Sequence, residues 1–126
     1  MSEAQMIVCP HCGSTNRVAA GKPLAEAKCG KCHEMLFDGH PAAVDAARFD
    51  RQINRSDVPV VVDFWADWCG PCHMMAPSFE AAARELEPRM RFLKLDTEAE
   101  PQVAARYDIR GIPTLSAFHK GSIRTQ

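Results

Sequence analysis

Six cysteines, grouped as three pairs with two residues between the partners, constrain this chain more than any other feature of its sequence. The pairs are Cys9 with Cys12, Cys29 with Cys32, and Cys69 with Cys72. The sixteen residues that separate the first pair from the second fit the spacing of a four-thiolate zinc site. The third pair instead follows a long apolar run and precedes a segment with helical periodicity. The first four cysteines and the last two therefore need separate interpretations.

Residues 1–40 are predicted to form a four-cysteine zinc-binding module. Residues 9–40 carry several glycines and prolines, few large apolar side chains and no sustained helical or alternating pattern, so this segment should not build a core of its own. Structural zinc can replace such a core, because it contributes on the order of 10 kcal/mol in small sites. The predicted ligands are Cys9, Cys12, Cys29 and Cys32.

Four protein sulfurs would fill the coordination sphere of the metal, so this Zn²⁺ is expected to be structural and to leave no position for a reactive water. Gly13 and Gly30 are expected to ease the two turns. His11 and His33 adjoin the ligands, but a set of four sulfurs does not need them. The alternative is that the four cysteines form reversible disulfides or are spare thiols.

A second domain is predicted over residues 43–126, since the chain is too short for two large domains. Its expected elements are a helix at 45–53, a strand at 58–66, a helix from 69 to about 88 that kinks at Pro77, a strand at 91–96, a helix at 101–107 and a hairpin of 114–118 with 122–125. One face of the first helix should carry Val44, Ala47, Phe49 and Ile53. Strand, helix and strand in succession indicate a parallel pair and hence an α/β fold.

The third cysteine pair is predicted to be a redox-active dithiol. It lies between the carboxyl end of the apolar strand and the amino end of the next helix, where free backbone N–H groups and the helix dipole stabilise a thiolate. Cys69 is therefore expected to attack a partner's disulfide, and Cys72 to resolve the mixed disulfide. The alternative, half of another metal site, has less support because no further cysteine lies nearby.

Several motifs together resemble the thioredoxin family. They are WADWCGPC at 65–72, the preceding VVVDF, GIPT at 111–114, and the upstream CPHC and CGKC, the last two as in the bacterial zinc-containing thioredoxin 2 subfamily. The resemblance implies a thioredoxin fold, in which helices flank a central mixed sheet, with an N-terminal zinc-ribbon-like module. It also implies a protein-disulfide reductase without a bound organic cofactor, recycled by a flavin-dependent thioredoxin reductase that uses NADPH.

The resemblance assigns further roles near the dithiol. Asp63 lies in the apolar strand, where an unpaired carboxylate is costly and its pKa tends to rise. The matching aspartate of the family assists deprotonation of the resolving cysteine, so we expect Asp63 to act on Cys72. Lys94 matches the lysine that neighbours this aspartate. The alternative for Lys94 is a solvated residue on an edge strand.

The resemblance also places a docking surface for disulfide-containing client proteins beside the cysteines. Its expected residues are Trp68, Gly70, Pro71, Gly111, Ile112 and Pro113. The Ile112–Pro113 bond should be cis, although the sequence alone favours trans, and the backbone of Ile112 would then pair with an extended client segment. Trp65 is either part of this surface or a core aromatic. His73 stands where many relatives carry lysine or arginine, and we expect a modest role for it.

Composition excludes several other functions. The formal net charge of −1 offers no global positive field for nucleic acid or an anionic membrane. The N-terminus has no signal-peptide pattern and no apolar run is long enough to span a bilayer, so a cytoplasmic protein is expected. Two alternatives remain open: an oxidant or isomerase of folding proteins, and a zinc-ribbon module that binds proteins or senses oxidation on a thioredoxin-like scaffold.

The last expected strand ends with the sequence at Gln126, whereas the family continues with a loop and a C-terminal helix. The thioredoxin domain is therefore expected to be truncated before that helix. One face of its sheet should then expose apolar side chains.

Overall fold

The computed structural model describes residues 3–126, which form two sheets and three α-helices. A two-stranded hairpin is built from β1 (Gln5–Val8) and β2 (Thr15–Val18). A five-stranded sheet has the order β3-β5-β4-β6-β7. Its strands are β3 (Ala42–Ala43), β4 (Val60–Trp65), β5 (Arg91–Asp96), β6 (Thr114–His119) and β7 (Ser122–Thr125).

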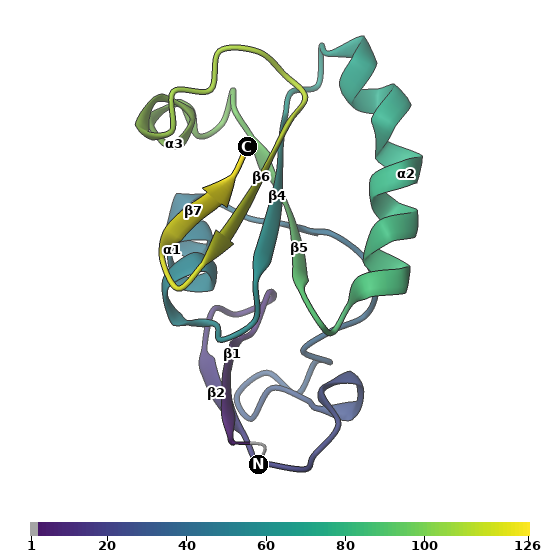
Figure 1. The fold of residues 1–126 in the computed structure, drawn as a ribbon, viewed down its shortest axis with the longest axis vertical. Helices are drawn as coiled ribbons and strands as arrows, with labels where there is room; N and C mark the ends of the chain where they lie inside the picture. Colours follow the sequence, from purple (N-terminus) through teal and green to yellow (C-terminus); the bar gives the residue numbers. More distant parts are fainter. Residues whose placement is uncertain (1–2) are drawn as a thin grey trace.

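Helices cover both faces of the larger sheet (Figure 1). These helices are α1 (Ala46–Arg55), α2 (Gly70–Leu86) and α3 (Pro101–Arg106). Helix α2 lies on one face, and α1 and α3 lie on the other. Strands β3, β4 and β5 are parallel to one another, β6 runs antiparallel to β4, and β7 runs antiparallel to β6, so the sheet is mixed. The predicted α/β class is confirmed, and β3 is an element that the sequence did not predict.

The central strand β4 is buried because its residues are apolar and β-branched on both faces. The main core lies between the sheet and α1, and it includes Phe49, Phe64 and Phe118. Phe49 packs edge-on against both other rings, at centroid distances of 6.4 and 5.5 Å. This layer fixes the position of β4, whose carboxyl end carries the third cysteine pair.

Helix α1 differs from its predicted face in two positions. Asp45 caps it by accepting a hydrogen bond from the backbone N–H of Arg48. Val44 therefore precedes the helix, although it is buried in the same core, and Ala47 is exposed instead of packed. The buried positions of the helix are Phe49, Gln52 and Ile53.

Helix α2 begins and ends where the sequence predicts. Cys69 is its N-cap, Pro71 lies in its first turn, and it continues through Pro77 to Leu86. A cis peptide bond joins Glu87 to Pro88 immediately after it. Phe79 and Phe92 pack edge-on between α2 and the sheet, beside a groove of about 310 Å³ with an almost wholly apolar lining.

The N-terminal module contains more structure than the sequence predicts. Its hairpin and a short 3₁₀ turn (Leu24–Glu26) enclose a small core that includes Ile7, Leu36 and Phe37. Val58 from the larger domain completes this core. The expectation that residues 9–40 build no core is therefore wrong, although the core is shared with the second domain. The module lies at the end of the molecule opposite the start of α2 (Figure 1).

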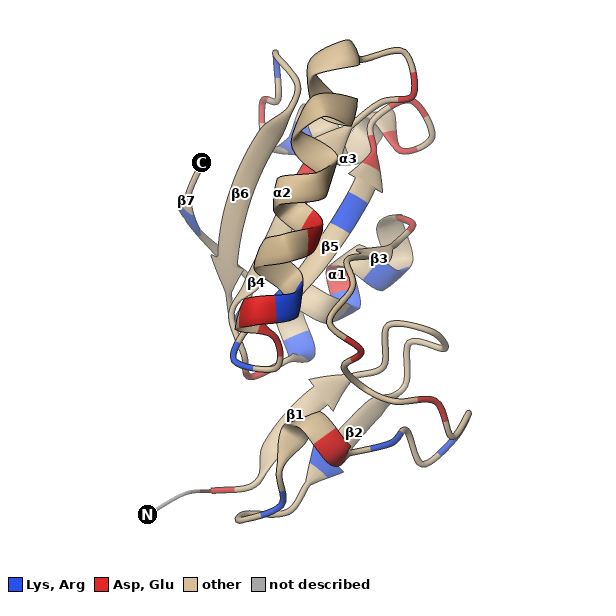
Figure 2. Ribbon diagram, turned by 90° about the vertical axis from the view of Figure 1, so that its right-hand side faces the viewer, with Lys and Arg blue, Asp and Glu red and all other residues tan. Residues whose placement is uncertain are grey.

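Acidic and basic residues are interspersed along both parts of the chain (Figure 2). Among residues 3–126, no helix has the length and apolar character needed to cross a bilayer.

Candidate functional site

Cys69 and Cys72 form a disulfide at the junction between β4 and α2. Both residues are 2% exposed. The backbone N–H of Cys72 donates to the Sγ of Cys69 over 3.1 Å, so this sulfur takes the place of a helix-capping oxygen. After reduction, the same N–H and the helix dipole would stabilise a negative charge on the Sγ of Cys69 more than on that of Cys72.

A loop that comes from far along the chain faces this disulfide. The Ile112–Pro113 bond is cis, as predicted. The carbonyl oxygen of Ile112 lies 3.7 Å from the Sγ of Cys69. Ile112 and Pro113 are half-buried and Gly111 is exposed, so this loop is partly accessible beside the sulfur.

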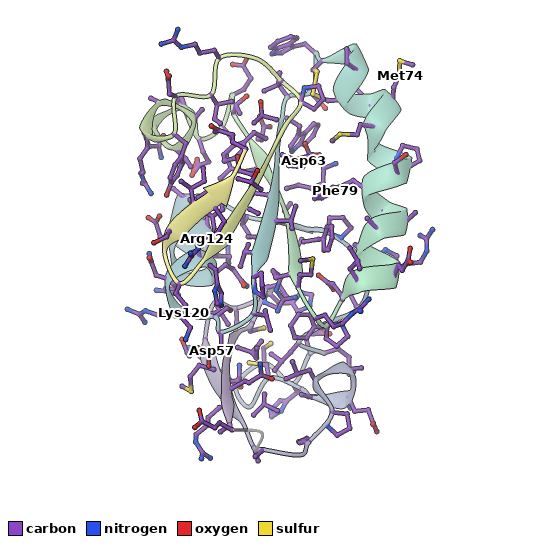
Figure 3. The ribbon with its side chains drawn as sticks, viewed as in Figure 1. Asp57, Asp63, Met74, Phe79, Lys120 and Arg124 are labelled. Carbon is purple, nitrogen blue, oxygen red and sulfur yellow. A yellow bond between two sulfur atoms is a disulfide. The ribbon has the colours of Figure 1, made fainter. Side chains whose placement is uncertain are left out.

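Asp63 lies on β4 with its side chain in the space between the sheet and α2 (Figure 3). It is 1% exposed, and its Oδ1 has no hydrogen-bond partner among the described residues. Burial raises the pKa of Asp63 to about 6, against the lowering effect of Lys94, its neighbour on β5. A carboxyl group with this pKa can take up and release a proton near neutral pH.

Lys94 is not on an edge strand, because β5 lies between β3 and β4. Its Nζ lies 4.4 Å from the ring centroid of Trp65. Trp65 is half-buried and also meets the ring of His73 edge-on. Trp65 therefore packs between Lys94 and His73 and is only partly exposed, unlike Trp68.

The surface around the disulfide is exposed and partly apolar. Trp68 is 69% exposed, and its Nε1 donates to the Oε1 of Glu98 over 2.6 Å. Gly70 and Pro71 are also exposed. Sequence reasoning missed Glu98, since an isolated glutamate thirty residues from Trp68 gives no signal of this contact. Met74, at 82% exposure, points away from the sheet on the outer side of α2 (Figure 3).

His73 links α2 back to the loop that precedes Cys69. Its Nε2 lies 2.7 Å from the carbonyl oxygen of Asp67. Because a carbonyl oxygen only accepts, the imidazole Nε2–H is the donor. His73 is exposed, so a single hydrogen bond of this kind contributes about 1 kcal/mol.

Replacement of His73 by alanine is expected to slow disulfide reduction by less than tenfold. The reason is that the variant loses one exposed hydrogen bond and leaves both sulfurs and the helix start in place. A single-turnover reduction assay at pH 7 measures this rate. A tenfold or greater loss would contradict the modest role that we expect.

The first four cysteines meet at one point in the N-terminal module. Their four Sγ atoms all lie within 4.8 Å of one another. The Sγ atoms of Cys9 and Cys32 are 3.6 Å apart, and those of Cys12 and Cys29 are also 3.6 Å apart. Four sulfurs at roughly 2.3 Å from a tetrahedral Zn²⁺ would be about 3.8 Å apart, so the cluster has the size of a zinc site.

Two similar turns aim these sulfurs. The N–H groups of Gly13 and His33 donate to the carbonyls of Cys9 and Cys29 over 3.0 and 2.9 Å. Both residues have positive φ, 80° for Gly13 and 66° for His33. The left-handed position of the second turn is therefore His33, and not Gly30, whose N–H instead donates to the Oδ1 of Asn16.

The surroundings of the cluster act in opposite directions on the pKa values of its thiols. The N–H of Lys31 and the side-chain amide of Asn16 both donate to the Sγ of Cys29. The backbone N–H of Cys32, the largest of these influences, lowers the pKa of Cys29 to about 6. Burial raises the pKa of Cys9 to about 12, so this thiol needs a cation in order to ionise at neutral pH. The donor set fits a closed four-thiolate metal site.

A disulfide at the start of a helix, bordered by a cis-proline loop and preceded by a strand that buries a carboxyl group, defines the class of thiol–disulfide oxidoreductases. Comparison with known proteins agrees with this class: residues 40–126 match the family described as "Thioredoxin", and residues 8–34 match the zinc-ribbon family described as "Thioredoxin 2, N-terminal". The chain belongs to the thioredoxin family and is a protein-disulfide reductase. The resemblance seen in its sequence is thus confirmed.

Named relatives and solved structures give the extent of this likeness. Thioredoxin C-3 of Corynebacterium nephridii is 44% identical over 91% of this chain and 79% of its own length. Thioredoxin 1 of Nostoc sp. is 48% identical over 64% of this chain and 75% of its own length. A thioredoxin mutant from Halobacterium salinarum has a TM-score of 0.62 at 32% identity, covering 70% of this chain and 76% of its own. Spinach chloroplast thioredoxin f has a TM-score of 0.64 at 34% identity, covering 68% and 72%.

Proposed function

We propose that the protein reduces disulfides of client proteins through Cys69 and Cys72 by way of a mixed disulfide. The observation that carries this proposal is the position of Cys69 as the N-cap of α2, with a backbone N–H directed at its sulfur. Only one of the two sulfurs receives this stabilisation, so the pair has a built-in order of attack.

The exchange takes place in two displacements. The thiolate of Cys69 attacks one sulfur of the client disulfide, the client S–S bond breaks, and the departing client thiolate takes a proton from solvent. The thiolate of Cys72 then attacks the Sγ of Cys69, which releases the second client thiol and forms the Cys69–Cys72 disulfide. Two electrons pass to the client.

Asp63 accepts the proton of Cys72 before the second displacement. The pKa of this buried carboxyl group, about 6, is close enough to neutral pH for the group to act as a base. Asp63 lies beside Lys94 on β5. The exposed Trp68, Gly70, Pro71 and Gly111 and the backbone of Ile112 and Pro113 receive an extended client segment beside Cys69.

A flavin-dependent thioredoxin reductase that uses NADPH returns the disulfide to the dithiol, so the protein transfers electrons between this partner and its clients. The cytoplasm is the proposed location.

Reduction of insulin by dithiothreitol tests the reductase proposal. The protein is expected to accelerate precipitation of the freed insulin chains well above the rate with dithiothreitol alone. A rate equal to that background would contradict the proposal.

The second part of the proposal is that Cys9, Cys12, Cys29 and Cys32 bind one structural Zn²⁺. The purified chain is expected to contain one zinc per molecule by elemental analysis. Cys12→Ser should lose most of this zinc, because three sulfurs leave the site open. Cys72→Ser is the matched control and should retain it. Equal zinc contents in the two variants would contradict the assignment.

A further inference from the structure

A buried ion pair lies where the metal-binding module meets the larger domain. It consists of Arg91, the first residue of β5, and Glu87, which follows α2. Their side chains are 2% and 1% exposed, and Nη1 of Arg91 lies 3.9 Å from Oε2 of Glu87. Burying a guanidinium or carboxylate is costly unless its remaining polar atoms are also bonded. The other contacts of Arg91 and Glu87 therefore identify the segments that this pair positions.

Arg91 holds the chain that enters the metal site. Its Nη2 donates to the carbonyl oxygen of Val8 over 3.1 Å, and Val8 directly precedes the ligand Cys9. The Nε2 of Gln52 donates to the same oxygen over 3.0 Å. The N–H of Val8 donates to the Oγ of Ser56 over 3.0 Å. Both polar groups of Val8 are therefore bonded to side chains of the larger domain.

The same pair holds the chain that leaves the metal site. The guanidinium of Arg91 lies 4.0 Å from the ring centroid of Phe37. The N–H of Gly39 donates to the Oε1 of Glu87 over 3.1 Å. Leu36, just before Phe37, is buried in the small core of the module and bonds through its N–H to the carbonyl of Ala27, two residues before Cys29.

We propose that Arg91 and Glu87 are positioning residues of the metal site, supplied by the thioredoxin domain. This inference rests on the proposed zinc binding. The pair ties down the chain next to Cys9 and the chain after Cys32, and so sets the separation at which the two turns bring four sulfurs together. Val58 of the same domain also belongs to the small core of the module, so the module packs directly against that domain.

Zinc release from the full-length chain to a colorimetric chelator tests the proposal. Arg91→Met is expected to accelerate release at least about 10-fold, the lower end of the effect of removing a partner that orients metal ligands. Arg106→Met is the matched control, since Arg106 forms a 2.7 Å ion pair with Asp50 in which both side chains are over 40% exposed. The control should release zinc within about twofold of the wild type.

A double variant separates positioning from general stability. Glu87→Leu with Arg91→Met leaves no unpaired buried charge, so it should recover most of the melting temperature lost in Arg91→Met. Zinc release should nevertheless stay fast, because the contacts to Val8 and Gly39 are still missing. Release that simply follows the melting temperature across the variants would overturn the proposal.

Three other outcomes are equally decisive. Release from folded Arg91→Met at the wild-type rate would overturn the inference. If Arg91→Met does not fold, the double variant removes the same contacts without leaving a buried charge unpaired, and release at the wild-type rate in that variant would overturn it instead. A wild type without zinc would contradict the metal assignment itself. This result distinguishes failure of the zinc assignment from failure of the positioning role of Arg91 and Glu87.

Discussion

Cys69→Ser is expected to abolish catalysis of insulin reduction, with a loss of at least about 100-fold that brings the rate to the dithiothreitol background. A serine hydroxyl is not ionised at neutral pH, so the variant has no nucleophile at the helix start. The remaining Cys72 sulfur lies one turn into α2, where the N-capping position and its directed N–H are not available to it.

The complementary variant Cys72→Ser gives a different expected result. It retains the attacking sulfur but has no thiol to resolve the intermediate, so it should accumulate a covalent adduct with a disulfide-bearing client. Mass spectrometry under non-reducing conditions detects this adduct, and added dithiothreitol should release it. Equal adduct yields from Cys69→Ser and Cys72→Ser would contradict the assigned order of attack.

Alkylation of the reduced wild type checks the electrostatic basis of this order. At pH 7, Cys69 should react with iodoacetamide roughly tenfold faster than an unperturbed thiol, because the helix start stabilises its thiolate. Cys72 should react more slowly. If Cys69 reacts like an ordinary free thiol, the proposed mechanism lacks its nucleophile.

The parts of the fold that follow from local sequence were predictable. The apolar run of β4, the periodicity of α2 and the Lys120–Gly121 turn between β6 and β7 each encode their element within a few neighbouring residues. The ends of α2 were also predictable, because Pro71 and Pro88 mark them. Strand β3 was not, since its two alanines become a strand only by pairing with Leu93 and Lys94 some fifty residues away.

In the candidate sites, too, local features were predictable and long-range contacts were not. The spacing of the cysteines predicted which sulfurs come together, because two intervening residues allow both sulfurs of a turn to face one point. The junction between the two domains was not predictable. Arg91 begins a strand after a turn, where an arginine is normally at the surface. Only the folded chain buries it against Val8 and Phe37, which are far from it in sequence.

Asp63→Asn is expected to stabilise the oxidised protein at pH 8 by about 3 kcal/mol while slowing disulfide exchange. The pKa of Asp63 rises from 3.8 to about 6 on folding. Between these values the folded protein binds a proton that the unfolded chain has lost, so the stability of the wild type falls as pH rises through this window. Above pH 6 the whole cost of burying the charge is present, and the neutral asparagine avoids it.

Urea unfolding at several pH values measures this effect. The advantage of Asp63→Asn over the wild type should be largest above pH 6 and should vanish below about pH 4, where the aspartate is protonated in both states. Asp67→Asn is the matched control, because Asp67 is exposed in the segment between β4 and α2, and it should change stability by less than about 0.5 kcal/mol at every pH. An advantage that does not depend on pH would show that the burial of charge is not its cause.

The same variant should resolve mixed disulfides at least about tenfold more slowly at pH 7, since Cys72 loses the base that takes its proton. Stability and exchange rate are thus expected to change in opposite directions. In that case the buried aspartate serves proton transfer from Cys72, and the protein gives up folding stability for this function. Rapid-mixing measurements of adduct decay would contradict this if Asp63→Asn and the wild type resolved at the same rate.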